Sequence, residues 1–436
     1  MGQVRCVPRQ DIRVRWGYDM HNKCIVVGGG ASGMMAALCA ARSGARVILL
    51  ERNEKLGKKM YITGKGRCNV TNASDMEQYQ RNIFRNPRFL YAAFARLDNA
   101  GMMALVEDLG VPLKVERGNR VFPVSDKSSD IIAALKRALE LESVDIRLNT
   151  RVSELLTEDG CCVGVALDDG DKLYADAVIL ATGGVSYPTT GSTGDGHSMA
   201  KSVGHAVTVL LPALVAIDTV ESWPGTLAGL TLKNVQLSAW LTGGRKEKRI
   251  YSQMGELLFT HTGISGPLAL TLSSLLPEDL STIRMAIDLK PALDEQTLDA
   301  RLLRDFKEMS RKQLGSVVDG LAPRSLAEQL MRLAGLPASM PVNSVTAQQR
   351  AALLKVIKGL ELHPKALGGF NEAIITRGGI NVKEINPSTM QSKLIKNLYF
   401  CGELMDVDAA TGGYNLQIAF STGALAGSSA ATAMEQ

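Results

Sequence analysis

The pattern of residues 23–51 constrains the fold more than any other feature of this sequence. A short apolar, β-branched run (23–27) is followed by three glycines (28–30), then by an uncharged, alanine-rich stretch (31–43) that ends at another glycine, and then by a second apolar run (46–50). Short apolar runs next to glycines are typical of buried strands, and the longer stretch is typical of a helix. The segment therefore predicts a strand, a tight turn, a helix and a second strand.

The turn in this unit has the spacing GxGxxG, because residues 28–33 read Gly-Gly-Gly-Ala-Ser-Gly. In such a turn Gly28 allows the sharp change of direction, Gly30 lets a pyrophosphate approach the backbone, and Gly33 lets helix and strand pack closely. Glu51 ends the second strand, 18 residues after Gly33. This is close to the spacing of about 20 residues at which a carboxylate that binds an adenosine ribose is expected. This order of features predicts a dinucleotide site, and a purely structural glycine turn is the alternative.

The C-terminal region carries a second cofactor-like pattern, which favours FAD over NAD. Residues 398–403 form a short apolar strand that ends in Gly402 and Glu403, where a carboxylate can accept hydrogen bonds from the hydroxyls of a ribitol chain. Residues 412–417 then precede a small-residue helix that extends to about residue 431. A helix N-terminus offers free N–H groups and a positive dipole end, which suit the negative charge of a reduced flavin. Tight packing of this helix on the sheet is the structural interpretation, and the two roles are compatible.

Five blocks of sequence, in a fixed order, extend this interpretation. They are residues 57–72, which include Gly-Lys-Gly-Arg-Cys-Asn-Val-Thr-Asn; 120–123, Arg-Val-Phe-Pro; 181–196, which include Ser-Tyr-Pro and Gly-Ser-Thr-Gly-Asp-Gly; 255–267, which include Leu-Phe-Thr-His and Gly-Ile-Ser-Gly-Pro; and 402–417. With these blocks the chain, from about residue 23 to its C-terminus, resembles the BaiN/YhiN-like family of FAD-dependent (NAD(P)/FAD-dependent, aminoacetone-oxidase-type) oxidoreductases. Gln391 and His197 depart from the family pattern. Neither departure affects the expectation of FAD, and both concern the expected substrate.

The resemblance implies an α/β fold of the two-dinucleotide-binding, Rossmann-like FAD type, with a β-barrel-like and helical domain inserted between its halves. The expected division is an N-terminal extension (1–22), a first FAD-binding part (23–206), the inserted substrate domain (207–366) and a second FAD-binding part (367–436). Periodicity predicts helices at 86–97, 101–109 and 128–141, a β-meander between 145 and 184, strands at 230–241, 249–252, 256–260 and 283–289, and helices at 293–306, 325–333 and 347–358.

The residues expected to contact FAD come from both ends of the chain. They are Gly28, Gly30, Ala31, Ser32, Gly33, Glu51, Arg52, Lys59, Thr63, Gly64, Gly66, Arg67, Cys68, Asn69, Val152, Gly183, Gly402, Glu403, Gly413 and Asn415. Arg67 is the best candidate for a fixed positive charge near the pyrophosphate, and a structural ion pair is its alternative. Cys68 and Cys401 lie in cofactor-type blocks; a redox-active thiol is one interpretation, and a small buried side chain is the more common one.

Flavin chemistry needs the protein only to position a substrate and to supply a proton. The candidate proton donors are Tyr187, His261 and Tyr414, and a packed or hydrogen-bonded structural role is the alternative for each. Arg377 either holds a substrate carboxylate or ends a strand. The histidines and cysteines show no zinc-binding spacing, so no metal is expected.

We therefore expect an FAD-dependent oxidoreductase that takes hydride transiently from NADH or NADPH, because no second strand-linked GxGxxG is present to hold a resident nicotinamide cofactor. Its family relatives suggest reduction of a hydrophobic small molecule, including reduction of carbon–carbon double bonds. One alternative is an FAD-dependent RNA-modifying enzyme, which requires a basic, aromatic face that residues 207–366 show little sign of. The other is a non-catalytic flavin-binding redox module.

Composition limits the partners and the compartment. A net charge of +5 over 436 residues falls short of a nucleic-acid or membrane-surface signature. Seven cysteines without a CxxC pair favour a reducing cytoplasm. The uncharged stretch 24–41 has the length of a membrane helix, but its three glycines break it, and the first twenty residues lack the apolar core of a secretory signal. We expect a cytoplasmic protein with a small-molecule substrate, and Met20 is an alternative start.

Overall fold

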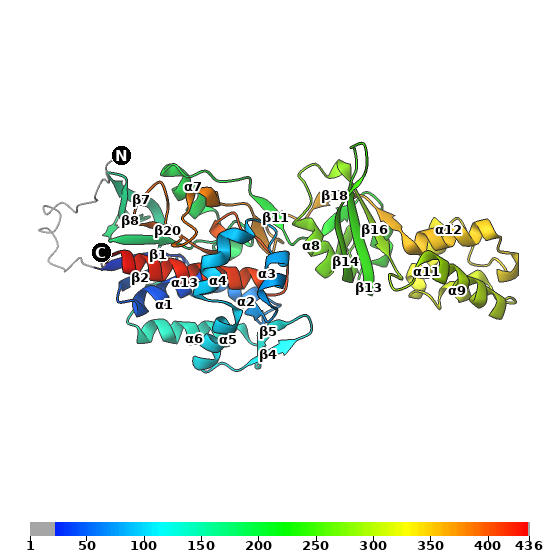
Figure 1. The fold of residues 1–436 in the computed structure, drawn as a ribbon, viewed down its shortest axis with the longest axis horizontal. Helices are drawn as coiled ribbons and strands as arrows, with labels where there is room; N and C mark the ends of the chain where they lie inside the picture. The colour runs from blue at the N-terminus through cyan, green and yellow to red at the C-terminus, as the bar shows by residue number, and fades with distance from the viewer. Residues whose placement is uncertain (1–21, 435–436) are drawn as a thin grey trace, which may run out of the picture. The chain divides into compact units, whose positions relative to one another are not determined.

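The computed structural model describes residues 22–434, and the chain divides into two compact units (Figure 1). Unit 1 comprises Met1–Pro212 and Phe370–Gln436, and unit 2 comprises Ala213–Gly369. The predicted N-terminal extension lies outside the described residues, apart from its last residue. Unit 1 is thus built from both ends of the chain, and unit 2 is an insertion between them.

A five-stranded parallel sheet forms the centre of unit 1. Its strands, in spatial order, are β20 (Leu398–Phe400), β10 (Ala177–Leu180), β1 (Lys23–Val27), β2 (Arg46–Leu50) and β6 (Asp145–Arg147). Ile179 of β10 pairs with Val26 of β1 on one side and with Tyr399 of β20 on the other. The sheet confirms the predicted α/β class, and β20 shows that the C-terminal segment completes the N-terminal sheet. The near-continuous apolar sequence of these strands is typical of a parallel sheet that is covered on both faces.

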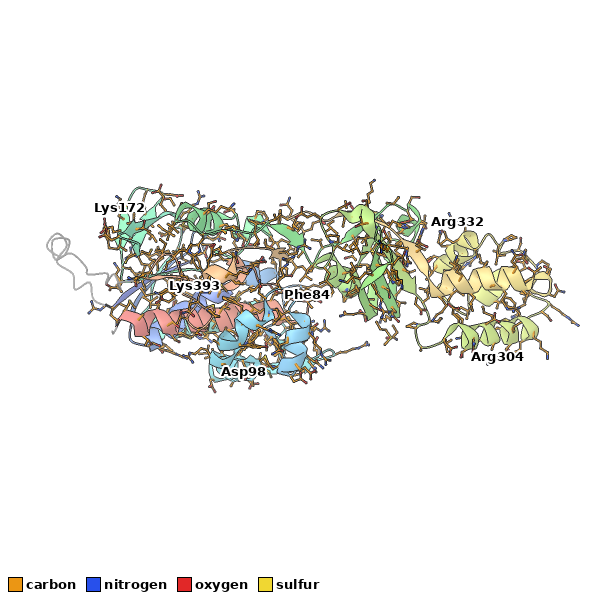
Figure 2. All side chains as sticks on the ribbon, turned by 45° about the horizontal axis from the view of Figure 1, so that its top comes forward. Phe84, Asp98, Lys172, Arg304, Arg332 and Lys393 are labelled. Carbon is orange, nitrogen blue, oxygen red and sulfur yellow. The ribbon has the colours of Figure 1, made fainter. Side chains whose placement is uncertain are left out.

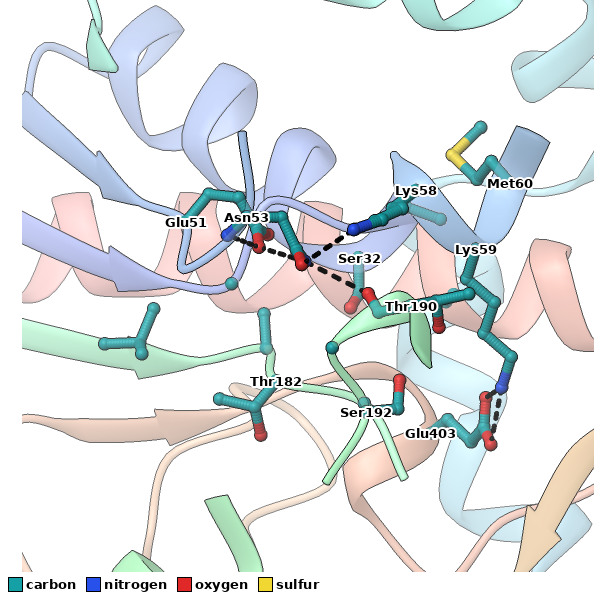
Figure 3. Close-up of a pocket in the computed structure, with 18 of the residues that line it drawn as sticks. Ser32, Glu51, Asn53, Lys58, Lys59, Met60, Thr182, Thr190, Ser192 and Glu403 are labelled. Carbon is teal, nitrogen blue, oxygen red and sulfur yellow. Dashed lines mark hydrogen bonds and ion pairs between the residues drawn. The ribbon is translucent and has the colours of Figure 1, made fainter. Parts of the chain in front are cut away.

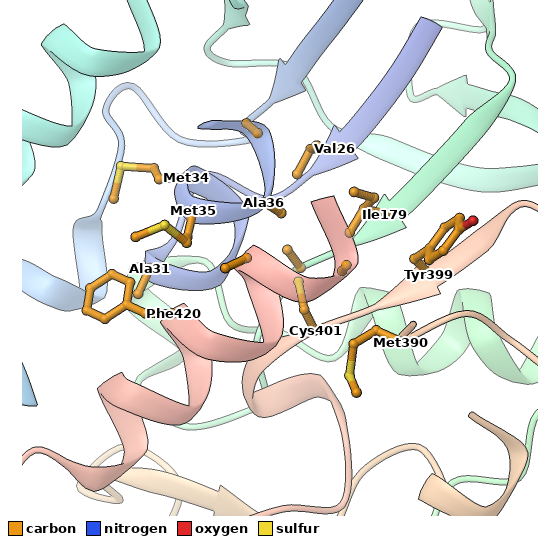
Figure 4. Packing of buried hydrophobic residues seen from close by; sticks show 14 of the residues in the cluster. Val26, Ala31, Met34, Met35, Ala36, Ile179, Met390, Tyr399, Cys401 and Phe420 are labelled. Carbon is orange, nitrogen blue, oxygen red and sulfur yellow. The ribbon is translucent and has the colours of Figure 1, made fainter. Parts of the chain in front are cut away.

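Two helices that follow glycine turns pack against each other beside this sheet: α1 (Ala31–Arg42) and α13 (Tyr414–Met434). Figure 4 shows Ala31 and Met35 of α1 next to Phe420 of α13. A Cβ on Gly423 would lie 2.3 Å from the carbonyl oxygen of Ser32, and a Cβ on Gly427 would lie 2.1 Å from that of Ala36. Only glycine permits this separation of the helices, and the close packing fixes α13 alongside α1.

The remaining elements of unit 1 surround this core. They are α2 (Lys58–Ile62), β3 (Thr71–Asn72), α3 (Met76–Asn82), α4 (Tyr91–Arg96), α5 (Asn99–Asp108), β4 (Leu113–Glu116), β5 (Arg120–Pro123), α6 (Ser128–Leu141), β7 (Val152–Glu158), β8 (Cys161–Leu167), β9 (Lys172–Tyr174), α7 (Asp195–Ser202), β11 (Leu211–Ala213) and β19 (Ile375–Arg377). Strands β7, β8 and β9 form the predicted meander. The helix predicted from residue 86 begins instead as a 3₁₀ turn (Pro87–Leu90), because Asn86 has φ of +51° and makes no side-chain cap.

Unit 2 contains a seven-stranded antiparallel sheet that closes on itself. Its strands, in spatial order, are β17 (Leu360–Leu362), β16 (Ile283–Asp288), β13 (Thr231–Leu241), β14 (Lys248–Phe259), β15 (Gly263–Ser265), β12 (Ile217–Thr219) and β18 (Pro364–Leu367). Only His363 separates β17 from β18, so one bent segment pairs with β16 on one side and with β12 on the other. The predicted β-barrel-like insertion is therefore confirmed. The two strands predicted at 249–252 and 256–260 are one strand, β14, because its pairing with β13 continues through Gln253 and Gly255.

The helical part of unit 2 comprises α8 (Gly266–Ser273), α9 (Glu295–Glu308), α10 (Leu314–Val318), α11 (Arg324–Leu333) and α12 (Ala347–Lys358). On α9 the buried side chains Leu298, Leu302 and Phe306 follow one another at a spacing of four residues, which is one face of a helix. Arg304 of α9 and Arg332 of α11 are exposed (Figure 2). The amphipathic pattern that predicted these helices thus separates a packed face from a solvated one.

Candidate functional site

Unit 1 contains a cleft of about 1380 Å³, a volume that includes its opening to solvent. The turn after β1, the ends of β2 and β10, the start of β7 and the first turns of α13 all line it. In open α/β sheets, ligands bind beyond the carboxyl ends of the strands, which is where this cleft lies.

The glycine turn between β1 and α1 forms one wall of the cleft. Gly28 has φ of +106°, and a Cβ there would lie 2.5 Å from the carbonyl oxygen of Ala181. A Cβ on Gly33 would lie 1.8 Å from the carbonyl oxygen of Gly28, so α1 approaches β1 this closely only with glycine at position 33. A Cβ on Gly30 would meet nothing within 4 Å. The backbone at Gly30 therefore opens onto the cleft, next to the free N–H groups at the start of α1.

Glu51, at the end of β2, is held in place by hydrogen bonds to both of its carboxylate oxygens. The backbone N–H of Gly29 donates to Oε2 at 2.7 Å. The backbone N–H and the side-chain Nδ2 of Asn53 donate to Oε1 at 2.8 and 2.7 Å. Asn53 Nδ2 also donates to the carbonyl oxygen of Thr190 at 3.0 Å (Figure 3). The carboxylate is thus fixed in the cleft wall, with lone pairs left to accept bonds from ligand hydroxyls.

Lys59 and Glu403 bring the two ends of the chain together in another part of the cleft wall. Lys59 Nζ lies 3.0 and 2.8 Å from the two oxygens of Glu403, as Figure 3 shows, and donates to Ser186 Oγ at 2.7 Å. Ser186 Oγ and the backbone N–H of Thr376 both donate to Glu403 Oε1. These four residues come from four separate segments of unit 1, so their network braces the cleft across the chain.

The N-terminus of α13 reaches the cleft through a tightly fixed turn. A Cβ on Gly413 would lie 2.3 Å from the carbonyl oxygen of Thr71, so this position requires glycine. Asn415 clamps the preceding loop, because its Oδ1 accepts from the N–H of Ala409 at 2.9 Å and its Nδ2 donates to the Ala409 carbonyl at 2.8 Å. Asn415 and Leu416 both line the cleft. The positive end of the α13 dipole therefore faces the same cavity as the start of α1.

Most of the expected cofactor residues line this cleft. They are Gly28, Gly30, Ala31, Ser32, Glu51, Arg52, Lys59, Thr63, Val152, Gly183, Glu403 and Asn415. The others lie outside its lining: Gly33, Gly64, Gly66, Arg67, Cys68, Asn69, Gly402 and Gly413. Several further residues line the cleft and were not among the expected contacts, including Asn53, Arg151, Thr182, Ser192, Asp195 and Val407.

Arg67 does not line the cleft. Its Nη1 lies 2.9 Å from Glu116 Oε1 and 3.2 Å from Asp126 Oδ1. The guanidinium also stacks over the ring of Phe122, 4.0 Å from the centroid. The structure therefore shows the ion pair that was the alternative interpretation of this residue, and the only expected positive charge in the 64–69 loop is directed to the β4–β5 hairpin.

The three candidate proton donors also lie outside the cleft lining. Tyr414 packs its ring 4.8 Å from that of Tyr79, and its hydroxyl lies 3.4 Å from Ser74 Oγ; burial raises its pKa. Tyr187 has φ of +50° and precedes a 3₁₀ turn. His261 belongs to unit 2, where it is exposed between β14 and β15. A catalytic role for any of them stays a prediction.

The two cysteines in the cofactor-type blocks are fully buried. Burial raises the pKa of both Cys68 and Cys401 to about 12. Both therefore stay as neutral thiols near neutral pH, whereas reactive cysteines are thiolates. This environment favours the small buried side chain over the redox-active thiol.

A buried pair of carboxylates from the 402–417 block adjoins the cleft, and neither was among the expected site residues. Asp408 is 0% exposed, and neither of its carboxylate oxygens has a hydrogen-bond partner among the described residues. Arg85 Nε lies 3.2 Å from Asp408 Oδ1, but burial still raises the pKa of Asp408 to about 7. Burial also raises the pKa of Asp406. Val407, between the two, lines the cleft.

Known proteins place this chain in a family. A family model described as "HI0933-like protein Rossmann domain" matches residues 22–429. The chain belongs to the HI0933-like family. This membership confirms the resemblance seen in the sequence blocks.

Two curated relatives cover nearly the whole of this HI0933-like protein. It is 31% identical over 417 residues to a 3-dehydro-bile acid delta(4,6)-reductase of Clostridium scindens, covering 94% of this chain and 99% of that protein. It is 29% identical over 407 residues to a ribosomal RNA dihydrouridine synthase of Escherichia coli, covering 91% and 95%. Among solved structures, a 3-ketosteroid delta1-dehydrogenase of Sterolibacterium denitrificans has a TM-score of 0.51 at 13% identity, covering 94% of this chain and 100% of that one. This last likeness concerns the fold alone.

The residues present in the cleft of the HI0933-like protein fit FAD. Gly30 leaves room for a pyrophosphate at the start of α1, Glu51 faces the position of a ribose, and the α13 N-terminus offers free N–H groups. Family membership and this cleft make the chain a flavin-dependent oxidoreductase.

Residues 22–434 contain no group of three or more His, Cys, Asp and Glu side chains that could hold a metal ion. Within the same range, no helix is both long and apolar enough to cross a membrane.

Proposed function

We propose that this protein uses FAD in the unit 1 cleft to reduce a carbon–carbon double bond of a hydrophobic small molecule, with NADH or NADPH as a transient hydride donor. The observation that carries the proposal is the cleft itself, which joins the GxGxxG turn, Glu51 and the start of α13 in one cavity. Bound FAD supplies the transfer of hydride, and the chain supplies binding and electrostatics.

The activities named for two relatives support this choice of reaction. A delta(4,6)-reductase and a dihydrouridine synthase are both named for the saturation of a carbon–carbon double bond. The cleft wall also presents apolar side chains: Ile374, Ile375, Val407, Leu416 and Ile418. Such a wall excludes water and favours an apolar substrate.

The chain's own residues have separable roles in this proposal. The N–H groups at the start of α1 bind the pyrophosphate, and the α13 N-terminus stabilises negative charge that develops in the ring system. The Lys59–Glu403 pair holds the two ends of the chain at fixed positions around the cofactor. NADH or NADPH then visits only transiently, because the sequence has no second strand-linked GxGxxG.

The test begins with the purified protein. We expect it to be yellow, to release FAD on denaturation, and to lose its flavin absorbance on anaerobic addition of NADH or NADPH. The reduced protein should regain its colour on addition of a steroid or bile acid with a double bond conjugated to a ketone, with formation of the saturated product. A protein that releases no FAD would contradict the cofactor assignment, and reduced protein that no such acceptor reoxidises would contradict the substrate class.

A second candidate is reduction of uridine in RNA, and one feature of unit 2 favours it. Little basic character was expected here from the sequence, but the turn after β13 carries exposed Arg245 and Lys246, and β14 begins with exposed Lys248 and Arg249. On the adjoining strands, Arg284 stacks over Trp240 at 4.2 Å from the ring. Clustered cations beside an aromatic ring suit an RNA backbone. Salt-sensitive RNA binding together with reoxidation by ribosomal RNA, and not by the steroid panel, would favour this candidate over the first.

A further inference from the structure

Three segments that are far apart in the sequence enclose one end of the cleft. They are residues 51–53 after β2, residues 150–152 at the start of β7, and residues 190–195 before and at the start of α7. Glu51 belongs to the first of them, so this is the end that suits an adenosine ribose. We call residues 190–195 the strap.

Asp195, the last residue of the strap, joins all three segments through one carboxylate. Its Oδ2 accepts from Arg52 Nη1 at 2.9 Å and from Arg151 Nε at 3.0 Å. Its Oδ1 accepts from Thr193 Oγ1 at 2.9 Å, and Arg52 Nη1 also donates to that hydroxyl. Partial burial acts to raise the pKa of Asp195, but the hydrogen bonds from Arg151 and Thr193 outweigh it and leave the pKa below its usual value. Asp195 is therefore an anion at neutral pH.

The other end of the strap is tied to the same segment. Asn53 Nδ2 donates to the carbonyl of Thr190 at 3.0 Å, and a Cβ on Gly191 would lie 2.5 Å from that nitrogen. Ser192, in the middle of the strap, is buried and lines the cleft. The strap is thus fastened at both ends to the residues that follow β2, with its centre against the cavity.

The ion pairs that Asp195 makes with Arg52 and Arg151 break readily. The side chains of Asp195, Arg52 and Arg151 are 25%, 31% and 47% exposed. Ion pairs with this exposure are individually weak and are screened by salt. These ion pairs hold the strap in place, and they can break without unfolding of unit 1.

We propose that Asp195 is a positioning residue for the cofactor, which holds Arg52, Arg151 and the strap around the adenosine end of FAD and whose ion pairs break when FAD leaves. The inference rests on the proposed function only in that the cleft holds FAD. The role concerns retention of the cofactor and is independent of the substrate.

The test measures the rate of FAD release from the full-length protein, followed by flavin fluorescence after mixing with an excess of a second FAD-binding apoprotein. We expect Asp195→Asn to release FAD about five to twenty times faster than the wild-type protein. Raising NaCl should accelerate release from the wild type and have little effect on the variant. Asp168→Asn is the matched control, because Asp168 pairs with Arg151 at 3.3 Å but not with Arg52. It should release FAD within about twofold of the wild-type rate.

A second variant keeps the inference falsifiable if Asp195→Asn folds poorly. Arg52→Gln leaves the Arg151–Asp195 pair intact and should also accelerate release, and the double variant should be no faster than Asp195→Asn, because both changes remove the same contact. Wild-type release rates in folded Asp195→Asn or Arg52→Gln would overturn the proposal. An equal loss of melting temperature in variant apoprotein and holoprotein would also overturn it, since it would indicate a purely structural role. Wild-type protein that does not bind FAD would instead overturn the proposed function.

Discussion

Replacing Gly427 by alanine tests whether close packing of α13 on α1 builds the cofactor cleft. The added Cβ would lie 2.1 Å from the carbonyl oxygen of Ala36, whereas ordinary contacts begin at 3.4 Å. The helices must therefore separate by about 1 Å. Because the opposing atom belongs to the backbone and cannot rotate away, the cost lies in the upper part of the range for overpacking, about 2–3 kcal/mol. Alanine also favours the helix by about 1 kcal/mol relative to glycine, which offsets part of that cost.

The net expectation for Gly427→Ala is a loss of about 1–2 kcal/mol in the free energy of unfolding of unit 1, with a fall in melting temperature of about 2–6 °C. FAD affinity should fall as well, because the first turn of α13 lines the cleft. Calorimetry and FAD titration of the apoprotein measure the two effects. Gly315→Ala in α10 is the control: its Cβ would come no closer than 3.4 Å to any neighbour, so only the helix preference should act. A Gly427→Ala protein as stable as the wild type, with unchanged FAD affinity, would refute this account of the helix contact.

Three further predictions follow from single side chains. Because the pKa of Asp408 is raised to about 7, its contribution to stability is largest below its unfolded pKa of about 4 and is lost as pH rises through 7, by up to about 4 kcal/mol in total. Urea unfolding at pH 5 and pH 8 should show about 2.5 kcal/mol of this difference for the wild type and a smaller change for Asp408→Asn. Lys59→Met should weaken FAD binding about five- to tenfold in a titration, because Glu403 loses its cationic partner; unchanged affinity would argue against a role for the pair. Arg67→Ala should leave FAD affinity within about twofold, since Arg67 pairs outside the cleft; a tenfold loss would restore its predicted place at the pyrophosphate.

The parts of the fold that the sequence predicts are those specified by contiguous residues. The unit from β1 to β2 is evident from the sequence because its two apolar runs, its glycine turn and Glu51 all lie within residues 23–51. Closure of the unit 2 barrel depends instead on a bend at His363, between two strand segments of three and four residues. Nothing in such short segments specifies which neighbours they pair with, so the register that closes the sheet is visible only in three dimensions.

The same division applies to the site. Gly30, Glu51 and Asn415 were predicted because each belongs to a local motif with a known relation to a helix or strand end. Asp195 also lies in a block that the sequence analysis singled out, but its role depends on Arg52 and Arg151, which are far from it in the chain. Asp408 lies in the 402–417 block, but nothing in that block indicates its raised pKa, which arises from burial by segments that the sequence does not place next to it.

The position of Arg67 outside the cleft lining agrees with the way positive charge is arranged in this cleft. Each lysine or arginine in the cleft lining has a carboxylate partner: Arg52 and Arg151 pair with Asp195, Lys58 with Glu54, and Lys59 with Glu403. Their charges are therefore largely compensated before any ligand binds. The field that favours a pyrophosphate comes instead from backbone N–H groups at the start of α1, which cost no side-chain ordering. In the sequence, the glycines of the turn indicate this helix N-terminus. The pyrophosphate site therefore does not require an unpaired arginine, because the helix N-terminus already supplies positive potential there.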